Sequence, residues 1–140
     1  MAILIKTGPL TRPHELDTIY VFKEKAYRDP VFGRDEQAFV WIDGDGKGGK
    51  DSRLYAAGIV TEEPSFDDPG KSDSLIRVKV RLTEIEPTRP LTYSADIRPH
   101  KDNPSNGVMH RLADVIAKKA HKKICPIGRE EAAILASRFE

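Results

Sequence analysis

The sequence lacks several features that would place it in a well-defined class. Cys125 is the single cysteine among 140 residues, so no disulfide can form within the chain. The four histidines are scattered and offer no zinc-ligand spacing. No apolar run approaches the roughly 20 residues of a membrane span. We therefore expect a reduced, cytoplasmic protein with no cofactor, no metal and no membrane partner.

The sequence also lacks an excess of positive or negative charge. Lys and Arg total 23 against 22 for Asp and Glu, which gives a formal net charge of +1. A field of this size does not attract any class of partner over long distances, so a basic binding surface would have to be local. The length suits one domain with a single core.

Aromatic residues make up 7% of the chain, and the single tryptophan lies in its best-defined pattern. Residues 39–42 alternate, residues 43–50 are rich in glycine, and residues 54–60 are again apolar. This succession predicts a β-hairpin with Trp41 on its first strand. Gly58 interrupts the second strand, which indicates a bulge or a close approach by another backbone or a ligand.

The remaining elements follow from periodicity and from turn residues. Residues 1–16, broken by two prolines, read as an N-terminal arm, and residues 17–140 as the domain. We expect further strands at 17–23, 75–83, 91–93 and 124–127, and amphipathic helices at 108–119 and 129–139. This order is not a βαβ alternation. It predicts an α+β, mostly β protein, a small antiparallel β-barrel with short peripheral helices.

Several of these segments together resemble a known family. They are Phe39–Ile42, the glycine-rich turn, Tyr55–Thr61, Pro90-Leu91, and Lys123–Ile127 before Glu130-Glu131. In order and spacing they resemble the EVE domain of the PUA-like superfamily over residues 17–139. The likeness is greatest to EVE modules that precede HNH nuclease domains in modification-dependent restriction enzymes. It implies a PUA-like barrel related to YTH and SRA domains, whose members flip a modified base into an aromatic cage.

The sequence departs from the family in one place. Stand-alone EVE proteins usually begin with a strand that contains tryptophan, and residues 20–22 fill that position here without one. The pocket wall on that side therefore lacks the tryptophan of the family. The resemblance assigns any cleavage to a nuclease domain or subunit outside these residues.

The resemblance implies a base pocket around Trp41, which would stack on an extruded base. Read from the sequence alone, a buried core position is the commoner fate of such a residue. Tyr27, Phe32 and Phe66 are the candidate second walls, with anchoring of loops as the alternative. Asp43 could accept a hydrogen bond from an exocyclic amine, or could bond the backbone of the turn that follows it.

A local group of cations is the candidate surface for the nucleic-acid backbone. Its members are Arg111, Lys118, Lys119, Lys122 and Lys123, flanked by His110 and His121, with Lys47 and Lys50 added by the glycine-rich turn. Phosphate contacts of this kind give salt-dependent affinity. The alternative is a solvated helix face. Two interpretations stay open for Arg77, Lys79 and Arg81: they extend this surface, or they only keep the sheet soluble.

These observations favour a binding domain over an enzyme, because no catalytic set has a recognisable local context. The first hypothesis is a DNA-binding module that flips a modified base, a modified cytosine in the first instance, and targets a nuclease or another partner. A PUA-like RNA-binding module in RNA modification or translation is the alternative. A small-molecule or protein-interaction barrel is the third.

Overall fold

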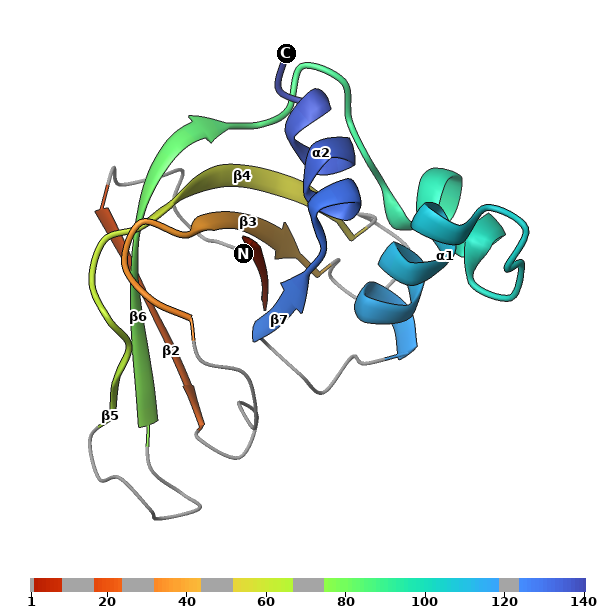
Figure 1. The fold of residues 1–140 in the computed structure, drawn as a ribbon. Helices are drawn as coiled ribbons and strands as arrows, with labels where there is room; N and C mark the ends of the chain where they lie inside the picture. Colours follow the sequence, from red (N-terminus) through yellow and green to blue (C-terminus); the bar gives the residue numbers. More distant parts are fainter. Residues whose placement is uncertain (1, 9–16, 24–31, 44–51, 67–74, 119–123) are drawn as a thin grey trace.

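The computed structural model describes residues 2–8, 17–23, 32–43, 52–66, 75–118 and 124–140 (Figure 1). The strands are β1 (Ala2–Thr7), β2 (Asp17–Lys23), β3 (Gln37–Ile42), β4 (Arg53–Val60), β5 (Ser65–Phe66), β6 (Leu75–Ile85) and β7 (Ile124–Ile127). The α-helices are α1 (Gly107–Ala113) and α2 (Arg129–Ser137). Shorter helical turns are η2 (Tyr93–Ile97), η3 (Arg98–His100) and η4 (Asp114–Lys118), of which η2 and η4 are π-helical.

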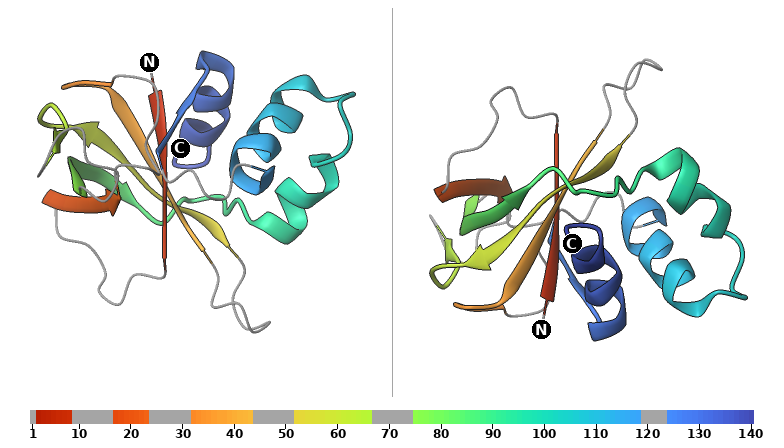
Figure 2. Two further views of the ribbon diagram at one scale, coloured as in Figure 1. Left: turned by 90° about the horizontal axis from the view of Figure 1, so that it is seen from below. Right: turned by 90° about the horizontal axis from the view of Figure 1, so that it is seen from above.

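All of these strands belong to one sheet. Its order is β2-β6-β4-β3-β1-β7, and β5 pairs with β6. The sheet curls into a half-barrel, and the helices gather on one side of it (Figures 1 and 2). The predicted α+β, mostly β architecture with peripheral short helices is therefore confirmed. It is a mixed sheet rather than a purely antiparallel one, because β1 and β3 run parallel.

The N-terminal residues are the largest correction to the sequence prediction. Residues 2–7 are not part of an arm but form β1, which lies between β3 and β7. All but the last of its residues are buried. A short apolar run before a Gly-Pro pair gives no local sign of its partners, which are distant in sequence. Residues 9–16 lie outside the described part of the chain.

The predicted pairing of β3 with β4 is present. One bulge interrupts this pairing, and a second interrupts the pairing of β4 with β6. The pairing of β3 with β4 shifts between Val40 and Trp41, which leaves Tyr55 as an extra residue on β4. The pairing of β4 with β6 shifts at Gly58, which leaves Thr83 as an extra residue on β6. A β-carbon at Gly58 would collide with the carbonyl oxygen of Arg81. The close backbone approach predicted for this glycine is therefore confirmed. Bulges of this kind increase the local bend and twist of a sheet.

The central strands are buried on both faces. Val40 and Ile42 contribute to a core inside the curl of the sheet. Phe39 and Trp41 contribute to a second core, which α1 and α2 cover. The predicted division of these four residues between two faces is confirmed, because side chains alternate along a strand.

The other predicted elements are confirmed with one exception. β2, β6, β7, α1 and α2 fall where periodicity placed them. Residues 91–93 do not form a strand: a single bridge joins Thr92 to Arg53, and η2 begins at Tyr93. Among the described residues, no helix has both the length and the apolar character needed to cross a membrane.

Candidate nucleic-acid interface

The parallel pairing of β1 and β3 brings the carboxyl ends of these two strands to the same end of the sheet. Thr7 pairs with Ile42, and Ile42 pairs in turn with Arg53 at the start of β4. On the other side of β1, Ile5 pairs with Ile124, the first residue of β7. The carboxyl ends of β1 and β3 and the amino ends of β4 and β7 therefore meet. We call this place the Thr7–Asp43 edge.

Asp43 lies at the centre of this edge. Its backbone N–H donates to the carbonyl oxygen of Thr7 at 2.9 Å, which continues the β1–β3 ladder by one residue. The residue is half-buried. A carboxylate at this place can accept hydrogen bonds from a ligand that arrives at the edge.

Lys6 lies one residue before the end of β1 and is buried, with a relative exposure of 2%. Its Nζ donates to the carbonyl oxygen of Val115 in η4 at 2.7 Å. This bond ties the edge to the helical side of the molecule. Lys6 was not among the residues predicted for the site, although a lysine at the end of an apolar run is a signal in the sequence, because lysine is rarely buried.

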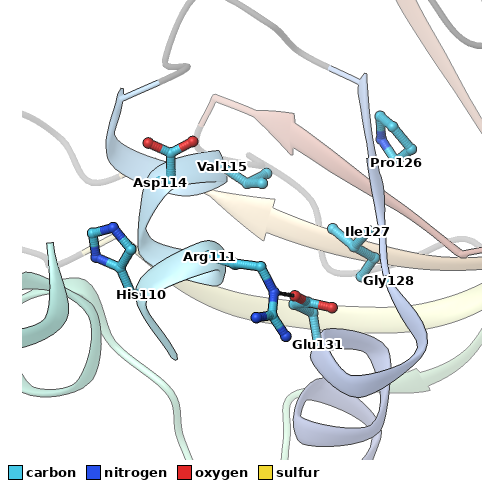
Figure 3. A pocket seen from close by; sticks show the side chains of 8 residues that line it. All are labelled: His110, Arg111, Asp114, Val115, Pro126, Ile127, Gly128 and Glu131. Carbon is cyan, nitrogen blue, oxygen red and sulfur yellow. Dashed lines mark hydrogen bonds and ion pairs between the residues drawn. The ribbon is translucent and has the colours of Figure 1, made fainter. Parts of the chain in front are cut away.

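A pocket of about 500 Å³ opens beside this junction, between α1–η4 and β7–α2 (Figure 3). Its lining residues are His110, Arg111, Asp114, Val115, Pro126, Ile127, Gly128 and Glu131. Nε of Arg111 donates to Oε1 of Glu131 at 2.5 Å. A weaker contact of 3.4 Å joins Nη2 of Arg111 to Oε2 of Glu130. His110 adds a bond from Nδ1 to the carbonyl oxygen of His100 at 2.9 Å, so this nitrogen carries the proton.

The Arg111–Glu131 pair shifts the titration of both groups. Burial raises the pKa of Glu131, but hydrogen bonds from Arg111 and from backbone N–H groups, with the charge of Arg111, bring it below its ordinary value. The hydrogen bond to Glu131 raises the pKa of Arg111. Glu131 is also the third residue of α2 after its N-cap, Gly128. The carboxylate thus joins α1 to the start of α2.

Comparisons with known proteins agree on the fold. No protein-family model and no curated protein matches the sequence. The DUF55 domain of human thymocyte nuclear protein 1 matches with a TM-score of 0.67 and 14% identity, over 100% of this chain and 99% of that one. The chain has the PUA-like EVE fold.

Two further structures carry the same EVE fold. One is human THYN1 protein in complex with DNA containing 5-methylcytosine, with a TM-score of 0.66, 15% identity, and coverage of 99% of this chain and 98% of that one. The other is Rpa0253 from Rhodopseudomonas palustris, solved by NMR, with a TM-score of 0.63, 18% identity, and coverage of 99% and 92%. At such identities the likeness establishes the EVE fold. The link to restriction enzymes stays a prediction.

Within this EVE fold, two of the aromatic residues predicted for the pocket belong to the core. Trp41 has a relative exposure of 0% and packs under the helices, and Phe32 has 1% and packs inside the curl. Neither side chain presents a surface on which a base could stack in this structure. The core alternative therefore describes Trp41, and the burial of Phe32 agrees with the alternative of a loop anchor. Tyr27 lies outside the described residues, as does the side chain of Phe66, whose backbone in β5 pairs with Ile76 of β6.

The predicted phosphate-binding cations separate into two groups. Arg111 is bound by two carboxylates, so a phosphate would have to compete with them. Lys118 is the last residue of η4, and its side chain lies outside the described part, as do Lys47, Lys50, Lys119, Lys122 and Lys123. Lys47 and Lys50 belong to residues 44–51, which the described residues Asp43 and Ser52 flank. Lys119, Lys122 and Lys123 belong to residues 119–123, which are followed by Ile124. Asp43, Ser52 and Ile124 all lie at the Thr7–Asp43 edge. The fold thus brings together described residues that flank both lysine-bearing segments.

Proposed function

We propose that this chain binds DNA that contains a modified cytosine, and that it reads the modified base after the base has left the helix. The observation that carries the proposal is the full-length likeness to a structure solved in complex with DNA containing 5-methylcytosine. The described residues that flank the lysine-bearing segments, Asp43, Ser52 and Ile124, lie at the Thr7–Asp43 edge, which supports the same function.

The predicted phosphate-binding groups are the lysines of residues 118–123, with Lys47 and Lys50 of the glycine-rich segment. Several such contacts give affinity that is largely independent of sequence and falls with salt. Preference for a base must therefore come from groups that touch its edge or its face.

Asp43 is the described residue that we expect to hydrogen-bond the edge of the base. Cytosine presents an exocyclic amine as a donor, and a carboxylate accepts from it. Since Trp41 and Phe32 are buried, stacking is left to loop aromatics, for which Tyr27 and Phe66 remain the predictions. Extrusion of a base costs a few kcal/mol, which stacking and edge contacts must exceed together. The module supplies recognition, and chemistry such as cleavage would belong to a partner.

Binding to matched oligonucleotides tests the proposal. Modified duplex, unmodified duplex and RNA of one sequence are titrated at two salt concentrations, with fluorescence anisotropy as the readout. We expect the modified duplex to bind most tightly and every affinity to fall with salt. Equal binding of the two duplexes would remove the reader function, and tighter binding of RNA would favour an RNA-binding module. Absence of binding at low salt would favour the small-molecule or protein-interaction alternative.

An Asp43→Ala variant then separates reading from background affinity. Discrimination between duplexes that carry a cytosine and a thymine at the recognised position should fall towards one, because the exocyclic amine is what distinguishes them at Asp43, while the salt-dependent background affinity persists. Glu84→Gln, at an exposed carboxylate on β6, is the matched control and should change neither quantity. An equal loss of both in Asp43→Ala would give Asp43 a structural role at the strand end.

A further inference from the structure

A groove lies at the end of the sheet opposite the Thr7–Asp43 edge, where β1 and β3 begin. Because these strands are parallel, Ala2 pairs with Gln37 there, roughly 16 Å from the pair of Thr7 with Ile42 at about 3.3 Å per residue. The groove has a volume of about 650 Å³. Its lining residues are Ala2, Asp35, Glu36, Gln37, Ile127, Gly128, Arg129, Ala132, Ala133 and Ala136. We call it the α2 groove.

The α2 groove combines an apolar lining with an acidic one. Helix α2 contributes three alanines, Ala132, Ala133 and Ala136. The residues before β3 contribute the carboxylates of Asp35 and Glu36. Arg129 also lines the groove, but among the described residues it forms no ion pair with either carboxylate. Lysine and arginine place an aliphatic stem along apolar surface and a charge at its end, so a groove of this composition fits such a side chain.

Glu36 has an acceptor that calls for a donor. Its Oε2 is buried and has no hydrogen-bond partner within the part of the chain that the structure describes. Buried polar atoms are nearly always hydrogen-bonded, because one without a partner is unfavourable. A cation that enters the groove can supply the donor to this oxygen. The observation therefore points to a positively charged ligand group.

Asp35 is held in place beside Glu36. Its backbone has a left-handed conformation, with φ of 71°, which is uncommon for residues other than glycine. The N–H of Asp35 donates to the carbonyl oxygen of Val60 at 2.8 Å, and the N–H of Val60 donates to the carbonyl oxygen of Glu36 at 2.9 Å. Both carboxylates thus stand on a backbone that is tied to β4, so a ligand meets them at a lower entropic cost.

A second hollow continues from the α2 groove along the sheet. It has a volume of about 320 Å³ and shares Asp35, Gln37 and Ala136 with the groove. Ile59 lines it, and at 43% exposure this residue is the exposed large hydrophobic side chain of the described residues. Ile59 pairs in register with Gln37. A single exposed isoleucine is ordinary by itself, but here it adds an apolar contact directly beside the acidic lining.

We propose that the α2 groove binds a protein partner, which inserts an arginine or lysine side chain and places a neighbouring apolar side chain on Ile59. The alanines of α2 contact the aliphatic stem, and Glu36 and Asp35 accept hydrogen bonds from the cation. Because the groove and the Thr7–Asp43 edge lie at opposite ends of β1, the partner does not compete with a ligand at that edge. Its binding is independent of the proposed function.

The peptide acetyl-Leu-Arg-Leu-amide is a direct probe, and the same peptide with citrulline in place of arginine is its neutral match. Each is titrated into the isotope-labelled protein and followed by NMR. The arginine peptide should shift the amide signals of residues 35–37, 59 and 132–136, and it should bind about tenfold more tightly than the citrulline peptide, since only its hydrogen bonds are charge-assisted. Absence of these shifts at millimolar peptide, or equal affinity of the two peptides, would overturn the proposal.

The variant Glu36→Gln tests the role of the unpartnered oxygen. Affinity for the arginine peptide should fall by about tenfold, while the melting temperature should not fall, because no hydrogen bond of this oxygen is lost. Glu62→Gln is the matched control: its side chain is 61% exposed and lies outside both linings, so the peptide affinity should stay the same. Wild-type peptide affinity in Glu36→Gln would overturn the proposal. If this variant does not fold, Asp35→Asn replaces it under the same criterion, since asparagine also tolerates a left-handed backbone.

Sedimentation over a range of concentrations distinguishes a different protein from a second copy of this chain. We expect a monomer at every concentration. A dimer that Ile59→Ser dissociates would assign the groove to a second copy and overturn its assignment to another protein. Glu36→Gln should bind the modified duplex like the wild type, and a failure of all DNA binding would leave the expected peptide results unchanged.

Discussion

Two basic regions of this molecule differ in how they are tied to the core. On β6, Arg77, Lys79 and Arg81 alternate with buried apolar residues and face solvent. On the helical side, the cations belong to α1, η4 and the segment that follows them. There the Arg111–Glu131 pair and the Lys6–Val115 bond connect the backbone of the basic region to the rest of the fold.

The difference lies in anchoring more than in the number of charges. Lys79 contacts Glu62 at 3.3 Å, but their side chains are 48% and 61% exposed. Pairs exposed to this extent contribute little and hold little in place. Glu131, by contrast, has a side chain that is only 7% exposed. A cation held on a fixed backbone meets a ligand at a lower entropic cost, so we expect the helical region to bind DNA and the β6 row to keep the sheet soluble.

The largest effect should come from Trp41, on whose core the helical region rests. Trp41→Ala should lower the free energy of unfolding by about 3–5 kcal/mol, because it empties a large volume in a closed core. Denaturant titration measures this, and Trp41→Phe should cost less. A Trp41→Ala variant with wild-type stability and no preference for modified DNA would instead return Trp41 to the base pocket.

The second-largest effect should come from a quadruple variant, in which glutamine replaces Lys118, Lys119, Lys122 and Lys123. We expect affinity for DNA to fall by about a hundredfold at moderate salt, and the slope of log K against log salt to decrease in size by about 3 to 4. The melting temperature should change little. Anisotropy titrations over a salt series give both numbers, and an unchanged slope would exclude this segment from the interface.

The contact between α1 and α2 that Arg111 and Glu131 form can be weakened by changing Glu131. Because its folded pKa lies below the ordinary value, its ionised form stabilises the protein above the unfolded pKa, and this stabilisation disappears as pH falls through the folded pKa. Glu131→Gln should therefore melt lower than the wild type at pH 7, and the gap should close towards about pH 3. Glu130→Gln is the control, since the Glu130 side chain is 70% exposed. A gap that stays constant with pH would mean that the charge of Glu131 is unimportant.

The smallest effect is expected from the other region. Replacement of Arg77, Lys79 and Arg81 together by glutamine should change DNA affinity by less than about threefold, since these cations act only through the screened general field. The same anisotropy assay measures it. A loss comparable with that of the four-lysine variant would place the DNA across both regions and remove the distinction.

Periodicity in the sequence was sufficient for elements that show it within a few residues. The alternation of β6 and the spacing of α1 are visible in the sequence because each element has one buried side, and β3 and β4, which follow each other in the described order, pair directly. Gly58 was predictable for a similar reason, since a glycine inside a strand indicates a close neighbour. These elements carry most of the half-barrel.

What the sequence could not supply depends on distant partners. β1 is stabilised by β3 and β7, neither of which is adjacent in the chain, so its apolar run resembled an arm. Trp41 shows the same limit for a site. A strand pattern places it on a face with Phe39, but whether helices cover that face depends on how α1 and α2 pack.

The place of β1 also determines when the fold can be completed during synthesis. Its partner β7 begins at Ile124, and their pairing joins Ile5 to Ile124. A chain still on the ribosome holds its first strand without this neighbour until nearly all of the domain has emerged. Contacts of such long sequence separation form slowly. The pairing of β1 with β7, beside the Thr7–Asp43 edge, is therefore among the last contacts of the described fold to form.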